Sequence, residues 1–271
     1  MRQDKVVFYS DERGDDFAGT DIKAVKVGAD FPFLPKGALF RVFEFIAYYL
    51  IALPIVAVIW FVFGGFRIYG RGHIKALRRE MKANGKKGFF LYANHTHWLD
   101  AFCGPLVCFP VKCHVLVSPD TVSIKGLRTV VQLLGAIPVP TERGAYEPFN
   151  AAIEARIAQG RAIMIFPEAH IWPYCTFIRD FKPGSFRYPV KEGAASVPVC
   201  VTYTRRKPGF LKAPARRVFV DRPIMPDSAL PQGQAKQQLR DTVYERLRRY
   251  AEKYSDYAVV KYVKKPPEAE E

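Results

Sequence analysis

The segment Phe45–Phe66, FIAYYLIALPIVAVIWFVFGGF, contains no charged residue over 22 positions. As a helix it would extend about 33 Å, enough to cross a bilayer hydrocarbon core of about 30 Å. A buried core helix is the alternative, although such helices are seldom so long and uniformly apolar. Pro54 near the middle leaves two membrane arrangements open, a full span or a re-entrant pair of short helices in one leaflet. The segment therefore predicts a membrane-embedded region near the N-terminus.

The charges that flank this segment predict its orientation. The following 21 residues contain one acidic residue, Glu80, against eight basic ones: Arg67, Arg71, Lys75, Arg78, Arg79, Lys82, Lys86 and Lys87. The preceding 21 contain only three basic residues: Lys26, Lys36 and Arg41. By the positive-inside rule, the long C-terminal part faces the cytoplasm. The basic flank would also hold it against anionic headgroups.

The overall charge supports a membrane partner. A formal net charge of +15 is typical of proteins that bind nucleic acid or anionic lipid. The chain has no helix-turn-helix, zinc-finger or RNA-recognition signature, so we expect no nucleic-acid partner. Its five cysteines are odd in number and irregularly spaced, which argues against a secreted disulfide framework and favours a reducing compartment.

The sequence divides into four regions. We expect a leader of uncertain order at 1–40, a membrane-embedded helix or re-entrant pair with a basic amphipathic linker at 41–87, the main folded domain at 88–258, and a solvated charged tail at 259–271. Within 88–258, apolar strand-like runs alternate with helical patterns. The expected strands are GFFLYA, AIPVP, RAIMIFP, ASVPVCVTYT and RRVFVDRPI, and a final helix is expected over about 227–255. This order predicts an α/β fold with a mixed, largely parallel sheet flanked by helices.

Polar side chains follow the predicted strands, where α/β proteins keep their sites. NHTHWLD follows the first strand, and FPEAH follows RAIMI, with Glu168 expected to be exposed at the strand end. If His95 lies in the turn and Asp100 in the next helical turn, the carboxylate can orient the imidazole as a base. His97 competes for Asp100, three residues away. A metal site formed by these three residues would make the chain a metal-dependent hydrolase.

Four motifs in order resemble those of the glycerophospholipid acyltransferases, in particular the 1-acylglycerol-3-phosphate acyltransferases. The resemblance covers about Gly88 to Val201, with the membrane segment before it. The motifs are the Asn-His-x4-Asp block with Asn94, His95 and Asp100, the Phe-Pro-Glu start with Phe166, Pro167 and Glu168, the Phe-Lys-x-Gly-x-Phe element with Phe181, Lys182, Gly184 and Phe186, and Val-Pro-Val at 197–199. The resemblance implies that His95 is the catalytic base, Asp100 orients it, and His97 is a bystander or substrate contact.

The chain departs from the family where the acceptor phosphate is bound. Ala169, His170, Ile171 and Trp172 stand where the family has Gly-Thr-Arg-Ser, and Thr141 stands where a second family arginine is expected. Substitute phosphate contacts are Arg143, Arg179 and Lys182, and His170 could contact the acceptor. Glu168, Pro167 and Gly184 would complete the substrate-binding set.

The resemblance implies a membrane-bound enzyme that transfers an acyl group from acyl-CoA or acyl carrier protein to a lysophospholipid. The expected acceptor is 1-acylglycerol 3-phosphate, which would yield phosphatidate in phospholipid synthesis. No cofactor or metal is implied, and the cysteines are not needed as nucleophiles. Another lysolipid acceptor, a metal-dependent hydrolase and a non-catalytic lipid-binding module are the alternatives. Donor, acyl chain length, acceptor headgroup and oligomeric state are not determined by the sequence.

Overall fold

A seven-stranded sheet forms the centre of the molecule. The computed structural model describes residues 5–19, 24–35, 37–85, 88–123, 126–206 and 213–266. The strand order is β2 (Arg67–Tyr69), β8 (Ala215–Val220), β7 (Ser196–Thr204), β3 (Phe89–Ala93), β6 (Ala162–Ile165), β4 (Cys113–Val117) and β5 (Ala136–Pro138). Neighbouring strands are parallel except β7 and β8. The predicted mixed, largely parallel sheet is confirmed.

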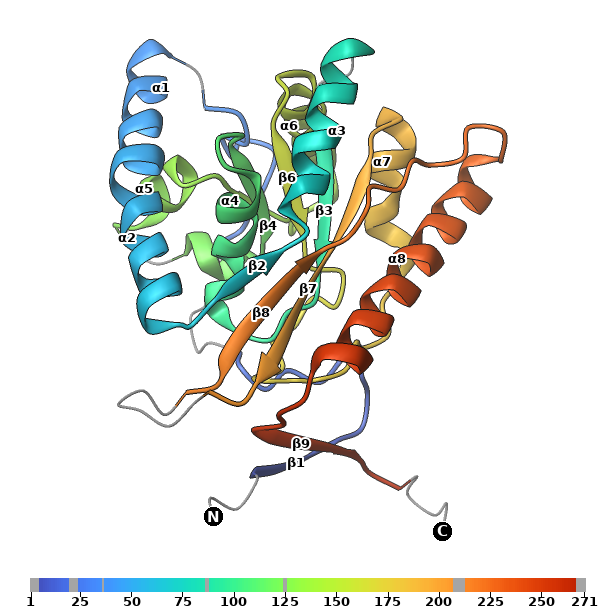
Figure 1. Cartoon of the computed structure of the whole chain (residues 1–271). Coiled ribbons are helices and arrows are strands. Elements are labelled where there is room, and N and C mark those ends of the chain that lie inside the picture. The colour runs from blue at the N-terminus through green and yellow to red at the C-terminus, as the bar shows by residue number, and fades with distance from the viewer. Residues whose placement is uncertain are drawn as a thin grey trace.

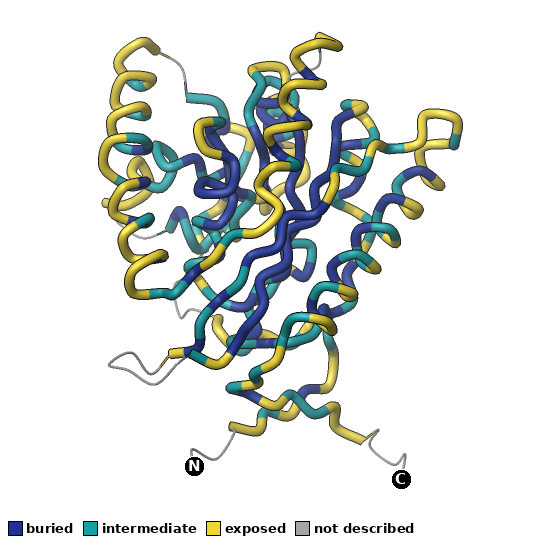
Figure 2. The backbone as a smooth tube through the Cα atoms, viewed as in Figure 1, coloured by how far each residue is buried: buried dark blue, intermediate teal, exposed yellow. Residues whose placement is uncertain are grey.

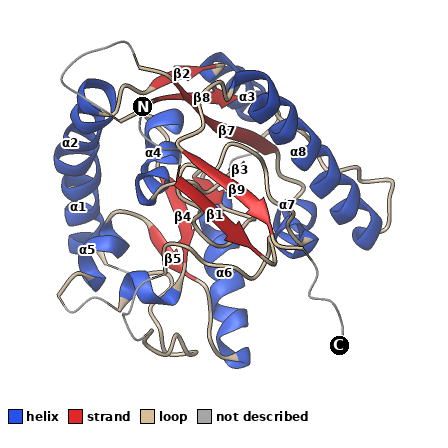
Figure 3. Ribbon diagram, turned by 90° about the horizontal axis from the view of Figure 1, so that it is seen from below, coloured by secondary structure: helices blue, strands red, loops and turns tan. Residues whose placement is uncertain are grey.

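Helices cover both faces of the sheet (Figure 1; Figure 3). One face carries α3 (Arg71–Ala83) and α4 (Cys103–Cys108), and the other carries α6 (Tyr146–Ala158), α7 (Arg187–Glu192) and α8 (Gln232–Tyr254). The short α5 (Arg128–Leu133) and four 3-10 turns complete this part: η3 (Trp98–Phe102), η4 (Pro119–Val122), η5 (Arg143–Ala145) and η6 (Pro183–Phe186). Alternate side chains of β3 pack into opposite cores, which explains why GFFLYA is apolar throughout.

The apolar segment forms one continuous helix from Ala38 to Phe63. It consists of α1 (Ala38–Phe45), α2 (Leu53–Val58) and the wider turns η1 (Ile46–Ala52) and η2 (Ile59–Phe63). Within the described ranges it is the one helix long and apolar enough to cross a membrane, and only 22% of its most apolar window is buried. The helix is therefore continuous at Pro54, where a re-entrant pair would break, and most of its apolar window is exposed rather than packed as in a core helix. Figure 2 shows its outward face exposed.

One face of this helix packs along the domain. Tyr48, Leu53, Val56 and Trp60 are buried and join the core formed with α3 and α4. The Tyr48 hydroxyl accepts the backbone N–H of Cys113 at 3.0 Å, and Trp60 stacks on Phe66 at a ring distance of 3.6 Å. The helix is thus attached to the domain along its length, as its position beside the sheet shows (Figure 1).

The two chain ends meet in a second, two-stranded sheet. β1 (Lys5–Tyr9) runs parallel to β9 (Val260–Lys264), across the end of the main sheet (Figures 1 and 3). The solvated tail predicted for 259–271 is therefore wrong at 260–264, where strand pairing satisfies the backbone and Tyr262 packs on Trp172. The expected leader also contributes core residues, since Val27, Phe31 and Phe33 are buried. Lys36, Lys86 and Lys87 of the predicted basic flanks lie outside the described residues.

Candidate active site

The loop that leaves β3 is fixed by the amide of Asn94. This side chain is 1% exposed, donates to the carbonyl of Val201 at 2.9 Å and accepts the backbone N–H of Val201 at 2.8 Å. The amide thereby continues the hydrogen-bonding pattern between β3 and β7 by one residue. His95 follows directly and is held in place at the carboxyl end of the strand.

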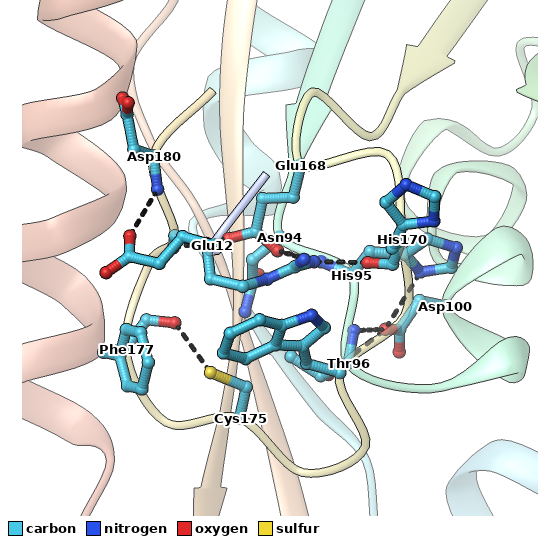
Figure 4. A network of polar contacts seen from close by, with 12 residues as sticks. Glu12, Asn94, His95, Thr96, Asp100, Glu168, His170, Cys175, Phe177 and Asp180 are labelled. Atoms are coloured by element: carbon cyan, nitrogen blue, oxygen red, sulfur yellow. Dashed lines mark hydrogen bonds and ion pairs between the residues drawn. The ribbon is translucent and has the colours of Figure 1, made fainter. Parts of the chain in front are cut away.

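Asp100 is fully buried in η3 and faces back toward this loop. One carboxylate oxygen, Oδ2, accepts the backbone N–H groups of Thr96 and His97, both at 2.7 Å. The same oxygen lies 3.7 Å from Nδ1 of His95 (Figure 4). This separation is about 0.5–1 Å longer than a hydrogen bond, as is common for catalytic pairs without substrate. The two side chains predicted to act together therefore face each other.

The imidazole of His95 has few other contacts. Its ring stacks on Phe166 with centroids 4.0 Å apart, and its side chain is 14% exposed. Among the described residues, neither its Nδ1 nor Oδ1 of Asp100 has a hydrogen-bond partner. The ring is thus packed flat against Phe166, and no hydrogen bond joins it to the carboxylate.

His97 serves the backbone instead. Its Nδ1 accepts the N–H of Leu99 at 3.1 Å, which caps η3, while the Asp100 carboxylate accepts the N–H of His97. Burial, and then the charge of Arg216, lowers the pKa of His97 to about 4. Nδ1 of His97 is thus engaged by the backbone, and the described residues contain no group of three or more side chains arranged to hold a metal ion.

Glu168 is not the exposed carboxylate that the sequence predicted. Glu168 is 3% exposed. Its Oε2 accepts the backbone N–H of His95 and a guanidinium N–H of Arg179, both at 3.0 Å. Oε1 accepts the backbone N–H of Arg179 at 3.0 Å. Because Arg179 satisfies its charge, Glu168 is stable in the interior, where it ties the loop after β6 to His95.

The other predicted substrate contacts are dispersed. Arg179 is 0% exposed, lies over the Trp172 ring at 4.8 Å and donates to the carbonyl of His170, so it does not reach a substrate in this conformation. His170 is partly exposed, with Nδ1 3.2 Å from the Asp16 carboxylate. Arg143, Lys182 and Gly184 are exposed, and Pro167 is half-buried.

Sequence reasoning missed two residues here. Trp172 is fully buried, and its indole donates to the carbonyl of Asp15 while its ring packs on Tyr9 and Tyr262. Arg216 of β8 is 5% exposed, with its guanidinium 5.8–6.0 Å from the rings of Tyr203 and Tyr174. The Tyr203 hydroxyl contacts Thr96, which contacts Asp100, so this cation lies beside the dyad. In the sequence, the signal for Arg216 was a charged residue at an inward-facing position of the predicted strand RRVFVDRPI.

Ala169 has a left-handed backbone, with φ of +64°. It stands where the resembled family has glycine, and a Cβ in this conformation costs roughly 1–2 kcal/mol. We expect Ala169→Gly to raise the free energy of unfolding by about 1 kcal/mol, after the entropy cost of glycine is allowed for. Chemical denaturation measures this. Gly144→Ala, at a glycine with ordinary φ and open space around its Cβ position, serves as the opposite exchange for comparison. If Ala169→Gly has a lower free energy of unfolding than the wild type, the backbone at Ala169 is not strained.

The fold and this loop define the class of protein. The largely parallel α/β sheet presents a His-x4-Asp pair at the end of one strand and a Phe-Pro-Glu turn at the end of its neighbour, as the resemblance to the glycerophospholipid acyltransferases implies. The acyltransferase family model matches residues 66–202, about half of the chain, and the protein therefore belongs to that family and is an acyltransferase. The resemblance to the glycerophospholipid acyltransferases is therefore confirmed.

Known structures agree on the fold. The crystal structure of the 1-acyl-sn-glycerophosphate (LPA) acyltransferase PlsC from Thermotoga maritima superposes with a TM-score of 0.52. The two share 16% sequence identity over 81% of each chain. No curated protein matches the chain in sequence. Family membership identifies residues 66–202 as an acyltransferase domain in place of the metal-dependent hydrolase or non-catalytic module that the sequence left open.

Proposed function

We propose that this acyltransferase esterifies the free hydroxyl of a lysophospholipid, with His95 as general base and Asp100 as its orienting partner. The observation that supports this proposal is the buried Asp100 carboxylate, which accepts two backbone N–H groups and faces His95 Nδ1 at 3.7 Å. A carboxylate at Nδ1 would leave Nε2 as the basic nitrogen and stabilise the imidazolium that forms.

The chemical step follows from these roles. Nε2 of His95 removes the proton of the acceptor hydroxyl as its oxygen attacks the thioester carbonyl of acyl-CoA or acyl carrier protein. The tetrahedral oxyanion collapses, the C–S bond breaks, and the thiolate takes the proton back from His95. No acyl-enzyme forms. The five cysteines are buried, and burial raises the pKa of Cys103 and Cys200, as expected of packing residues rather than nucleophiles.

The proposed acceptor is 1-acylglycerol 3-phosphate, with phosphatidate as the product. Its phosphate requires cations, and arginine provides two parallel donors. Exposed Arg143 and Lys182 are candidates, and Arg216 is the described cation linked to the dyad through Tyr203. The burial of Arg179 against Glu168 favours the alternative, a lysolipid with a different headgroup.

The helix 38–63 is proposed to hold the enzyme on the membrane. Because one face packs along the domain from Tyr48 to Trp60, the outward face is free to lie in one leaflet. That face exposes large apolar side chains: Leu39, Val42, Phe43, Phe45, Ile46, Leu50, Ile51, Ile55, Val58, Ile59, Phe61, Val62 and Phe63. The basic residues of α3 would meet anionic headgroups, with the catalytic domain on the cytoplasmic side.

An acceptor panel tests the substrate. Purified enzyme with labelled acyl-CoA or acyl carrier protein is offered lysophosphatidate, lysophosphatidylcholine and lysophosphatidylethanolamine. We expect lysophosphatidate to be preferred by at least about tenfold, because one charge-assisted contact contributes about 1.5–3 kcal/mol. Arg143→Gln, Lys182→Gln and Arg216→Gln should then reveal which cation sets this preference. Equal rates with all acceptors would reject lysophosphatidate as the specific substrate.

A further inference from the structure

Two adjoining pockets, of about 270 and 290 Å³, lie where α1 meets the segments that precede β4 and β6. Arg41, Glu44, Gln159 and Arg161 line both. Arg161 directly precedes β6, whereas the active-site loops follow the other ends of β3 and β6. The pockets are therefore at the opposite end of the sheet from His95. Figure 1 shows α1 beside that end of the sheet.

The pockets carry an excess of positive charge. Arg41, Lys112, Arg156 and Arg161 line one or both, and among the described lining residues Glu44 is the one carboxylate. Glu44 lies 2.7 Å from Lys112 and 3.5 Å from Arg161, so it is shared by two cations. Arg156 is 6% exposed, and its hydrogen-bond partners among the described residues are neutral: the carbonyls of Phe33 and Ala152, and His114.

This charge is not balanced within the described residues. Burial lowers the pKa of Lys112 to about 8, although Glu44 raises it, and repulsion from Arg161 and Arg156 adds a smaller lowering effect. Burial likewise lowers the pKa of Arg156 to about 10. Buried charges without partners are unfavourable, so a bound anion would stabilise the cluster.

His114 supplies an independent observation. It lines the first pocket and is 2% exposed. Its Nδ1 lies 3.2 Å from both Nε of Arg156 and the carbonyl of Gly135. The contact with Arg156 requires Nδ1 to accept, because the arginine Nε always carries a hydrogen, whereas the contact with the Gly135 carbonyl requires Nδ1 to donate. The other ring nitrogen, Nε2, is buried and has no hydrogen-bond partner among the described residues. A buried polar side chain whose hydrogen bonds are incompletely satisfied thus lines the first pocket.

We propose that these pockets bind a phosphate group at a second site, separate from the active site. Phosphate suits a set of arginines and a lysine, because its oxygens accept several charge-assisted bonds at once. The phosphate could belong to an anionic lipid headgroup or to a soluble phosphate compound. Phe45 and Tyr49 line the second pocket at the start of the apolar face of the helix. A lipid would place its headgroup among the cations and its chains along that face.

The test uses the full-length protein in neutral detergent and the double variant Arg41→Gln/Arg161→Gln. Thermal unfolding is followed with added inorganic phosphate, with short-chain phosphatidylglycerol, and with short-chain phosphatidylcholine. We expect the apparent Kd of the wild type for the anionic compound to be at least about tenfold lower than that of the double variant. Stabilisation by phosphatidylglycerol alone assigns the site to a lipid headgroup, and stabilisation by inorganic phosphate assigns it to a soluble compound.

A control and an opposite change complete the test. Arg248→Gln/Lys253→Gln removes the same charge from exposed positions on α8 and should leave the affinity within about twofold. Glu44→Gln removes the pocket carboxylate and should tighten anion binding, which a merely misfolded pocket would not do. Equal stabilisation of the wild type and the pocket variant, or no response to either anion, would overturn the second site. Acyl transfer by the wild type is measured separately, so failure here leaves the proposed function intact.

Discussion

Replacing His95 with alanine is expected to lower acyl transfer by about 10³-fold or more. Positioned general bases typically contribute 10²–10⁴-fold, and the alanine variant also loses the imidazolium that returns the proton to the leaving thiolate. Its backbone N–H still binds Glu168, so the loop should keep its shape. The measurement is the initial rate of labelled phospholipid formation, beside vesicle binding and thermal unfolding, both of which should be unchanged.

His97→Asn is the matched control. Asparagine is a favourable helix N-cap, so its side chain can accept the N–H that the imidazole of His97 now accepts from Leu99. Because the pKa of His97 is lowered to about 4, this residue is neutral from about pH 5 upward. The pH–rate profile of His97→Asn should therefore overlay that of the wild type above pH 5. Loss of activity in His97→Asn with retention in His95→Ala would reverse the assignment of the base.

The sequence predicted the elements and the dyad because both depend on local patterns. Each strand is a short continuous apolar run. His95 and Asp100 are only a few residues apart, so one turn of the chain brings them together. The continuous helix 38–63 was harder to predict, since Pro54 permits a break. The structure resolves this point because tertiary packing of Tyr48 and Trp60 supports one straight element.

Long-range pairings could not be predicted in this way. Glu168 was expected to be exposed because nothing in FPEAH indicates that Arg179, eleven residues later, turns back to neutralise it. The pairing of β1 with β9 joins residues about 255 positions apart, and short strands of mixed polarity carry little periodic signal. The cation cluster of Lys112, Arg156 and Arg161 likewise forms only when the residue before β4 and the segment 156–161 come together beside Glu44 of α1.

Introducing two aspartates on the outward face of the helix, Ile51→Asp/Ile55→Asp, is expected to release the protein from membranes. Both isoleucines are about half exposed, at 52% and 54%, and lie one helical turn apart, so the folded domain does not depend on burying them. Exchanging an isoleucine for an aspartate in a bilayer costs roughly 3 kcal/mol, and two such changes amount to about 10⁴-fold in partitioning. Sedimentation with phosphatidylcholine vesicles measures the effect.

A control double variant tests whether the loss of vesicle binding is specific to the outward face of the helix. Val6→Asp/Phe8→Asp places the same two charges at exposed apolar positions of β1, away from the helix, and should change vesicle binding by less than about threefold. The activity of the helix variant should depend on how the acceptor is presented. The helix variant should lose transfer to a long-chain acceptor held in vesicles but keep transfer to a short-chain acceptor dissolved as monomers, because its dyad is intact. If both double variants bind vesicles as the wild type does, the outward face of this helix is not the membrane contact, and the apolar surface must serve another partner.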